Sequence, residues 1–163
     1  DRVVGEPVES AVSTPARLTV YDAPLVSESI TSQMRENLDD ELTEVKSENA
    51  IDRITSQANP RTLERVPAGA RFKVRFILDV LCEEDKDLLP QLVQALRLLE
   101  DDALGGGGSR GSGRVSLGNL RLAWRKRSFY AAGQPEEELA AGADLSGLQA
   151  LVTQDGLAAR LTD

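Results

Sequence analysis

Alternating apolar and polar positions define the strands that this sequence predicts. Within Arg71–Leu81, every second position from Phe72 to Val80 is apolar, which predicts a strand with one buried face. A shorter alternation over Ala16–Asp22 predicts an earlier strand. A third strand is predicted over Arg114–Trp124, where the apolar positions change parity at Gly118-Asn119 and so indicate a β-bulge.

Other segments follow the helical period. Asp87 is the expected cap of a helix that runs to about Asp101, and the leucines of this helix form a broad apolar face suited to packing on a sheet. Ser27 is expected to cap a short helix over about 28–38, and a weak helix is predicted around 145–152. Residues 1–15 have no period and are expected to form a loop. This order of elements predicts an α+β fold.

A long polar segment separates the first two predicted strands. Residues 44–55 and 62–66 look extended but are polar at most positions, and Asn59-Pro60 between them is a turn signal. We therefore expect a long β-hairpin whose tip is too polar to be core, with Pro67-Ala-Gly69 turning the chain back.

Composition removes several kinds of chemistry. The 163 residues include no histidine, which excludes Ser-His-Asp and Cys-His catalysis and the common zinc sites. Any metal would be a hard ion held by carboxylates. The single cysteine, Cys82, excludes an internal disulfide framework and favours a reducing, cytoplasmic location. No apolar run approaches the ~20 residues of a membrane span, so no membrane partner is expected.

The charge distribution changes what the net charge of −8 implies. From Ala103 to Pro135 there are six basic residues and no acidic one, and Arg53–Arg75 is similarly basic. Local fields, rather than the net charge, attract polyanions such as nucleic acid.

The basic stretch begins with a glycine-rich loop that holds six of the thirteen glycines, in positions 105 to 113. Glycines ending in Ser109-Arg110-Gly111 offer backbone N–H groups, a hydroxyl and a guanidinium to an anion. A flexible linker is an alternative interpretation. A dinucleotide-binding loop is rejected because the predicted order is helix, loop, strand, and a Walker loop is rejected because Gly-Lys-Ser/Thr is absent.

Two long motifs resemble one known family. The segment Leu99–Val115, which contains the glycine loop, resembles the C-terminal glycine-rich loop of the RAMP superfamily of CRISPR proteins. The segment Glu44–Gly69 is similar to the thumb of one branch, the repeated backbone subunit of the type III-A (Csm) interference complex in the Cas-seven group. Tyr21-Asp22-Ala23 is similar to the segment upstream of that thumb, and the resemblance covers roughly residues 16–124.

The resemblance implies a fold. It implies a ferredoxin-like, RRM-like RAMP domain over residues 1–130, with a protruding β-hairpin thumb at about 43–67 and a C-terminal tail over 131–163. The family's first strand and its catalytic aspartate loop have no counterpart here, so the N-terminal part is expected to be missing.

The resemblance also implies a function in antiviral defence. Copies of the subunit line up along a guide (cr)RNA in a filament with other Csm-complex subunits. The complete protein is an endoribonuclease that cleaves complementary target RNA with a divalent metal, Mg or Mn. The chain as given is expected to bind RNA incompletely.

Candidate site residues follow from the two motifs. The Asn59-Pro60 pair at the expected tip could wedge between bases. Asp22, Glu44, Glu48 and Glu64 match acidic positions near the family's cleavage site, although structural salt bridges to nearby basic residues explain each of them somewhat better. The RNA-binding candidates are Lys46, Arg53, Asn59, Pro60, Arg61, Arg65, Gly107, Gly108, Ser109, Arg110 and Gly111.

Two alternatives remain open. One is a non-catalytic, structural RNA-binding RAMP subunit of a type III complex. The other is a nucleotide-binding enzyme that uses the glycine loop for phosphate. Steep loss of affinity with salt would favour an RNA-backbone binder over the nucleotide enzyme.

Overall fold

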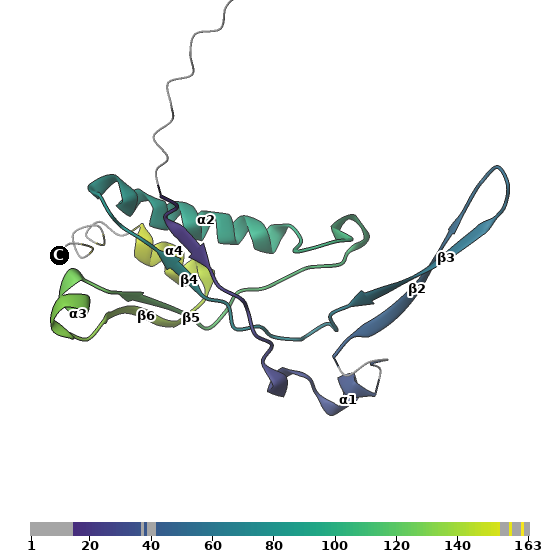
Figure 1. The fold of residues 1–163 in the computed structure, drawn as a ribbon, viewed down its shortest axis with the longest axis horizontal. Coiled ribbons are helices and arrows are strands. Elements are labelled where there is room, and N and C mark those ends of the chain that lie inside the picture. The colour runs from purple at the N-terminus through teal and green to yellow at the C-terminus, as the bar shows by residue number, and fades with distance from the viewer. Residues whose placement is uncertain (1–14, 37, 39–41, 154–156, 158–160, 162–163) are drawn as a thin grey trace, which may run out of the picture. The chain divides into compact units, whose positions relative to one another are not determined.

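The fold is mixed α+β with small antiparallel sheets, as the periodicities predict. The computed structural model describes residues 15–36, 38, 42–153, 157 and 161. Short 3-10 turns at Ser27–Ser29, Glu83–Asp87 and Gly108–Arg110 separate some of the elements. The helices and strands, shown in Figure 1, are β1 (Leu18–Val20), α1 (Ser32–Arg35), β2 (Glu44–Ile51), β3 (Ala58–Arg65), β4 (Phe76–Leu78), α2 (Leu88–Asp101), β5 (Leu120–Trp124), α3 (Arg127–Ala132), β6 (Glu137–Ala143) and α4 (Leu145–Val152).

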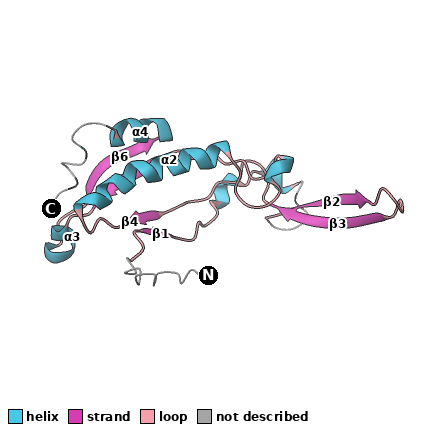
Figure 2. Cartoon of the chain, turned by 90° about the horizontal axis from the view of Figure 1, so that it is seen from above, coloured by secondary structure: helices cyan, strands magenta, loops and turns pink. Residues whose placement is uncertain are grey.

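The chain divides into two units. One is Leu18–Ile77, which holds the β2–β3 hairpin, and the other combines Asp1–Arg17 with Leu78–Asp163. The strands form three separate pairs, β1 with β4 and β2 with β3, both visible in Figure 2, and β5 with β6, visible in Figure 1. None of the described helices has the length and low charge needed to cross a membrane.

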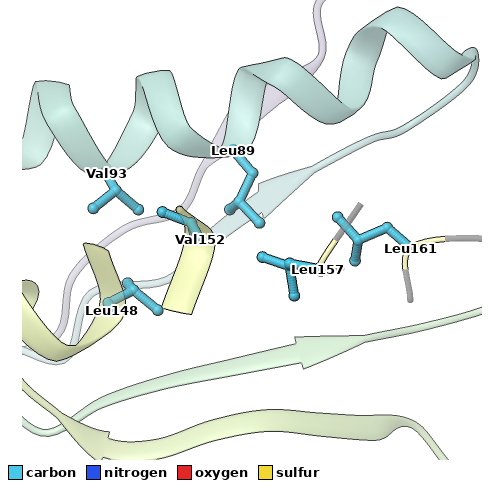
Figure 3. Close-up of a cluster of buried hydrophobic side chains, with 6 residues drawn as sticks. All are labelled: Leu89, Val93, Leu148, Val152, Leu157 and Leu161. Atoms are coloured by element: carbon cyan, nitrogen blue, oxygen red, sulfur yellow. The ribbon is translucent and has the colours of Figure 1, made fainter. Parts of the chain in front are cut away.

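The main core lies in the second unit, between helices and a sheet. The leucine stripe of α2 and the apolar side of α4 meet there, and Leu120, Leu122 and Trp124 of β5 pack against them. The close-up in Figure 3 shows the buried cluster above the strands: Leu89, Val93, Leu148, Val152, Leu157 and Leu161. The helix predicted over 87–101 forms as α2, but its buried face is narrower than predicted, because only Leu89 and Val93 are buried and Leu98 is 61% exposed. The weak helix expected around 145–152 is α4.

The division at residue 130 stays a prediction. Residues on both sides of that position contribute to the cluster, because α4 and Leu157 pack with α2. Two elements after β5 had no strong sequence signal. The short helix α3 ends at Gly133 in the left-handed conformation, and the Ala-rich strand β6 pairs with β5.

An ion pair fixes the start of the described chain in this unit. Arg17 Nε donates to Asp85 Oδ2 at 2.8 Å, and the same oxygen accepts from the N–H groups of Leu81 and Cys82. These hydrogen bonds lower the pKa of Asp85 to about 2. The Leu81 N–H contributes most to this shift, and Arg17 also contributes. Asp85 is buried. It holds the chain that enters β1 against the turn before α2.

The strand predicted over 71–81 is mostly wrong. Only Phe76–Leu78 forms a strand, and Phe72 makes one isolated bridge to Leu25. Tyr21 N–H donates to Arg75 O, but the next contact is Lys73 N–H to the carbonyl of Pro24. Because Pro24 has no N–H to return, the ladder is interrupted there. The strand expected over 16–22 is likewise reduced to β1.

The helix expected over 28–38 is also shorter. It is replaced by a 3-10 turn and by α1, since Ile30 and Thr31 have extended dihedrals that interrupt the helix. Thr31, rather than Ser27, is the cap, and its Oγ1 accepts from Met34 N–H at 3.2 Å. Positions 37 and 39–41 lie outside the described residues, as do 1–14 of the expected N-terminal loop.

The third predicted strand is confirmed only in its second half, as β5. The predicted bulge is displaced as well. Pairing of β5 with β6 shifts register between Leu120 and Leu122 and again between Leu122 and Ala123, while Asn119 just before the strand has a φ of +53°. The parity change in the sequence therefore marks a left-handed residue at the strand entrance.

Candidate nucleic-acid interface

The glycine loop follows α2 directly and is closed by hydrogen bonds. Leu104 N–H donates to Gly113 O at 2.8 Å, which joins the two ends of the loop. Inside it, Gly108–Arg110 makes one 3-10 turn between Gly107 and Gly111, which have φ values of +78° and +81°. Because glycine tolerates these values, the sequence can form two left-handed corners separated by three residues. A closed loop of this kind differs from a flexible linker.

The anion nest predicted from this loop is partly occupied by the loop itself. Arg110 N–H and Ser112 N–H donate to Gly107 O at 2.9 Å and 3.2 Å, and Gly111 N–H donates to Gly108 O at 2.9 Å. These three amides are therefore committed internally. What the loop presents instead is bare backbone, since a side chain at Gly105, Gly106 or Gly111 would meet nothing within 4 Å.

Gly113 cannot be replaced by a residue with a side chain unless the loop changes its conformation. An added Cβ there would lie 2.3 Å from the carbonyl oxygen of Leu104, and its φ is +82°. Both the conformation and the close approach of the two strands of the loop thus require glycine at this position. Ser109 and Arg110 are exposed and lie within the 3-10 turn that these constraints hold in place.

The hairpin has the length that the sequence predicts and a different tip. Strands β2 and β3 pair antiparallel from Glu44↔Arg65 to Ile51↔Ala58. The turn lies at Asp52–Gln57, where the Asp52 carboxylate accepts from Ile54 N–H at 2.8 Å and Thr55 N–H at 3.3 Å. These bonds lower the pKa of Asp52.

The expectation that Asn59-Pro60 forms the tip is wrong. Both residues lie inside β3, where Asn59 pairs with Ala50 and Pro60 with Asn49. Proline is tolerated because a two-stranded hairpin has only edge strands. The residue that the tip presents is Ile54, whose side chain is 94% exposed. The sequence signal for this turn was Asp52 itself, because an aspartate side chain can accept hydrogen bonds from the backbone N–H groups that follow it.

One face of the hairpin carries a ladder of ion pairs. Arg65 donates to both carboxylate oxygens of Glu44, at 2.8 and 3.1 Å, and Arg61 donates to Glu48 at 3.0 Å. The hydrogen bond from Arg65 lowers the pKa of Glu44, and Glu44 raises the pKa of Arg65 in turn. Lys46 lies between the two glutamates on the same face, opposite Leu63. Arg53 is exposed in the turn.

The acidic candidates do not form a metal site. Residues directly opposite in a strand pair share a face, so Glu64, which pairs with Val45, lies on the face away from Glu44 and Glu48. Asp22 is exposed just after β1. Among the described residues, no group of three or more carboxylate or thiol side chains is placed to hold a metal ion. The donors that a divalent metal would need are thus not assembled among these residues.

The segment Ala103–Pro135 contains no acidic residue, but the fold brings acidic residues from outside it close to its basic side chains. Arg121 donates to Glu136 and Glu138, Arg125 Nε donates to Glu136 at 2.8 Å, and Lys126 lies 3.7 Å from Glu137. Pairing of β6 with β5 brings these glutamates across from the basic residues. Part of the positive charge that the sequence displays is therefore neutralised by the fold.

Comparison with known proteins identifies the family. The sequence matches the profile described as RAMP superfamily over residues 3–116, which includes both the hairpin and the glycine loop. This chain belongs to the RAMP superfamily. Within it the chain is a Csm3-like member, because its relatives share one name, "CRISPR system Cms endoribonuclease Csm3".

Three such relatives illustrate the similarity. The Methanocaldococcus jannaschii protein is 34% identical over 137 residues, which is 82% of this chain and 52% of that protein. The Enterococcus italicus protein is 38% identical over 117 residues, 70% of this chain and 52% of that protein. The Mycobacterium tuberculosis protein is 43% identical over 94 residues, 49% of this chain and 40% of that protein. The chain spans about half the length of the curated relatives it matches.

Proposed function

We propose that this chain is the RNA-holding part of a backbone subunit of a type III-A CRISPR (Csm) effector, and that it binds guide (cr)RNA for antiviral defence. The observation that carries the proposal is the family match over residues 3–116, which contains the two elements suited to RNA. The partners would be guide RNA, target RNA, further copies of the subunit in a filament and other subunits of the complex, inside the cell.

The domain assignment is part of this proposal. Residues 1–130 would form the RAMP domain, with a ferredoxin-like, RRM-like arrangement in the complete protein, and the hairpin at about 43–67 would be its thumb. The small β1–β4 and β5–β6 pairs support an incomplete sheet, as does the coverage of about half of each relative. Residues 131–163 would form the C-terminal part.

The glycine loop would hold the guide backbone. Gly107 and Gly108 would shape the loop, because an added Cβ there would meet Ser112 and Ala103. Gly111 has open space beside it, so the sugar-phosphate chain can approach closely, while Ser109 and Arg110 supply a hydroxyl and a cation. Contacts to phosphate position RNA without reading its sequence. Arg110 would therefore contribute equally to the binding of every guide sequence.

The hairpin would contact the guide–target duplex. Ile54 at the tip is the apolar side chain placed to enter a base stack, in place of the Asn59-Pro60 pair inside β3. Lys46 and Arg53 would attract phosphates directly. Arg61 and Arg65 are already paired with Glu48 and Glu44, which would lower what each arginine contributes to phosphate binding.

Cleavage of target RNA is assigned to the complete protein, which would be an endoribonuclease dependent on Mg or Mn. The described carboxylates do not fit that metal, so we assign the cutting group to a part of the complete protein outside the described residues. A non-catalytic, structural RNA-binding subunit is the second candidate. It is favoured by the pairing of Glu44 and Glu48 with arginines, which leaves those two carboxylates a structural role.

RNA binding of the complete protein tests the proposal. Affinity for a single-stranded guide-like RNA, measured by fluorescence anisotropy at several salt concentrations, should fall steeply as salt rises. Arg110→Ala should reduce the slope of log K against log salt by about 0.7 and weaken all guide sequences equally. Arg35→Ala, an exposed arginine on α1, is the matched control and should change neither quantity. A flat salt response together with tight ATP binding would overturn the proposal.

The role of the hairpin has its own test. A fluorescent base analogue is placed along the target strand, and its unstacking is measured when the complete protein binds the guide–target duplex. Ile54→Ser should abolish the unstacking without changing thermal stability, because the side chain makes almost no contacts in the protein. Unstacking that survives Ile54→Ser would remove Ile54 from this role.

A further inference from the structure

Helix α3 presents an exposed aromatic ring for which the proposed function has no use. The side chain of Tyr130 is 73% exposed, and it is the one large hydrophobic residue exposed among the described positions after Leu104. Tyrosine usually buries the body of its ring and leaves only the hydroxyl in water. A ring left almost bare therefore has space for a partner on its face.

The ring is held in place by its neighbours. Phe129 contacts Tyr130 edge to face, with ring centroids 5.0 Å apart and planes at 80°. Arg125 lies over the Phe129 ring at 4.9 Å, and Glu136 fixes that guanidinium from the other side. Glu136 first, and Tyr130 second, raise the pKa of Arg125. Such support reduces the conformational entropy that binding would otherwise cost.

The surroundings favour a nucleobase over a protein partner. Protein interfaces need a contiguous apolar centre, and no second exposed large hydrophobic residue accompanies Tyr130 in the described part of 105–153. A base needs only one π-face, and every base has one.

We propose that Tyr130 is a stacking platform for an unpaired base of the RNA, a contact separate from the glycine loop and the hairpin. The proposal rests on the RNA-binding function proposed above. Figures 1 and 2 place α3 and the glycine loop toward opposite ends of α2. This helix has 14 residues, so it is about 21 Å long. The stacked base thus lies several nucleotides from the phosphate near Arg110.

Binding of single-stranded RNA to the complete protein tests the platform. Tyr130→Ala should weaken binding about 5- to 100-fold, the range for one stacked base, and Tyr130→Phe should stay within about twofold because it keeps the ring. The salt slope of Tyr130→Ala should equal that of the wild type, since no phosphate contact is lost. Leu98→Ala, which shortens another exposed side chain, on α2, should bind as the wild type does.

An abasic scan locates the contact. The scan uses a set of RNAs that each lack the base at one position. The wild type should bind more weakly only when the base at one particular position is missing, and Tyr130→Ala should cause no further loss of affinity for that RNA. Unchanged affinity of Tyr130→Ala, or equal losses for Ala and Phe, would overturn the platform. If the wild type binds RNA and Arg110→Ala weakens it while Tyr130→Ala does not, the platform alone fails. If the wild type binds no RNA, both proposals fail.

Discussion

Substitution of Gly113 by alanine tests how tightly the glycine loop is built. The φ of +82° costs an L-residue about 1–2 kcal/mol, and the Cβ would lie 2.3 Å from Leu104 O, so that carbonyl has to move. Movement breaks the Leu104 N–H···O bond to Gly113, which is worth about 1 kcal/mol. Alanine also restricts the unfolded chain, and this entropic effect offsets the cost by roughly 0.4–1 kcal/mol. The net cost is about 2 kcal/mol.

Two other glycines separate the contributions. Gly105→Ala meets only the unfavourable φ of +84°, with nothing within 4 Å, and should cost about 1 kcal/mol or less. Gly118→Ala meets neither problem and should be neutral. Urea midpoints of the complete protein should therefore fall in the order Gly118, Gly105, Gly113. Guide-RNA affinity of Gly113→Ala should fall by up to about 30-fold, the equivalent of 2 kcal/mol.

The reasoning fails if Gly113→Ala and Gly118→Ala have the same urea midpoint and the same RNA affinity. Loss of affinity without a change in the midpoint would mean that the strain is relieved by local opening of the loop. Hydrogen exchange at the Leu104 amide distinguishes that case, because opening exposes an amide that donates to Gly113 O in the closed loop.

Three further predictions concern the core, the ion pair and the hairpin. Leu157→Ala should lower the free energy of unfolding by about 2–4 kcal/mol, because the side chain is buried against α2 and α4. Asp85→Asn should lower the thermal midpoint near pH 7 and reduce the loss of stability between pH 3.8 and about 2, where the folded-state carboxylate with its lowered pKa otherwise loses its stabilising charge. Glu48→Gln should release Arg61, raise RNA affinity and steepen the salt slope by up to about 0.7.

Each of these has a matched control. Leu104→Ala removes an exposed leucine and should change stability by less than about 0.5 kcal/mol. Asp79→Asn removes an exposed carboxylate close to β4 and should leave the acid response intact. Glu28→Gln removes the same charge as Glu48→Gln but away from the hairpin strands. Equal RNA affinities for the two glutamine variants would mean that net charge, and not release of Arg61, decides binding.

Elements with a strong local signal could be predicted from the sequence. Helix α2 carries a leucine stripe and forms over the expected residues. The expectation that Asp87 caps it is wrong, because Asp87 has helical dihedrals at the end of a 3-10 turn and its side chain makes no capping hydrogen bond. The hairpin was expected because two extended polar segments flank a turn signal, yet its turn moved to Asp52–Gln57. A turn depends on which side chain can bond the backbone, and Asp52 competes successfully with Asn59-Pro60.

The candidate site was predicted in part. The glycine loop lies where the sequence places it, between a core helix and a core strand, and its glycines take the left-handed values that such a loop needs. The ion pairs were not foreseeable in detail, because Glu44 and Arg65 are 21 positions apart and meet only through the register of β2 and β3. Tyr130 was missed because one aromatic residue in a sequence does not reveal its exposure.

The sequence alone determined the family, the existence of the helix, the hairpin and the loop, and the chemistry that a chain without histidine cannot perform. These properties depend on local periodicity, residue type and motif order. Tertiary structure decided which charges remain available. It placed Glu136 against Arg121 and Arg125, and it placed Glu64 on the face of the hairpin away from Glu44. Coulomb interactions depend on distance in space, which strand register sets and which spacing along the chain does not reveal.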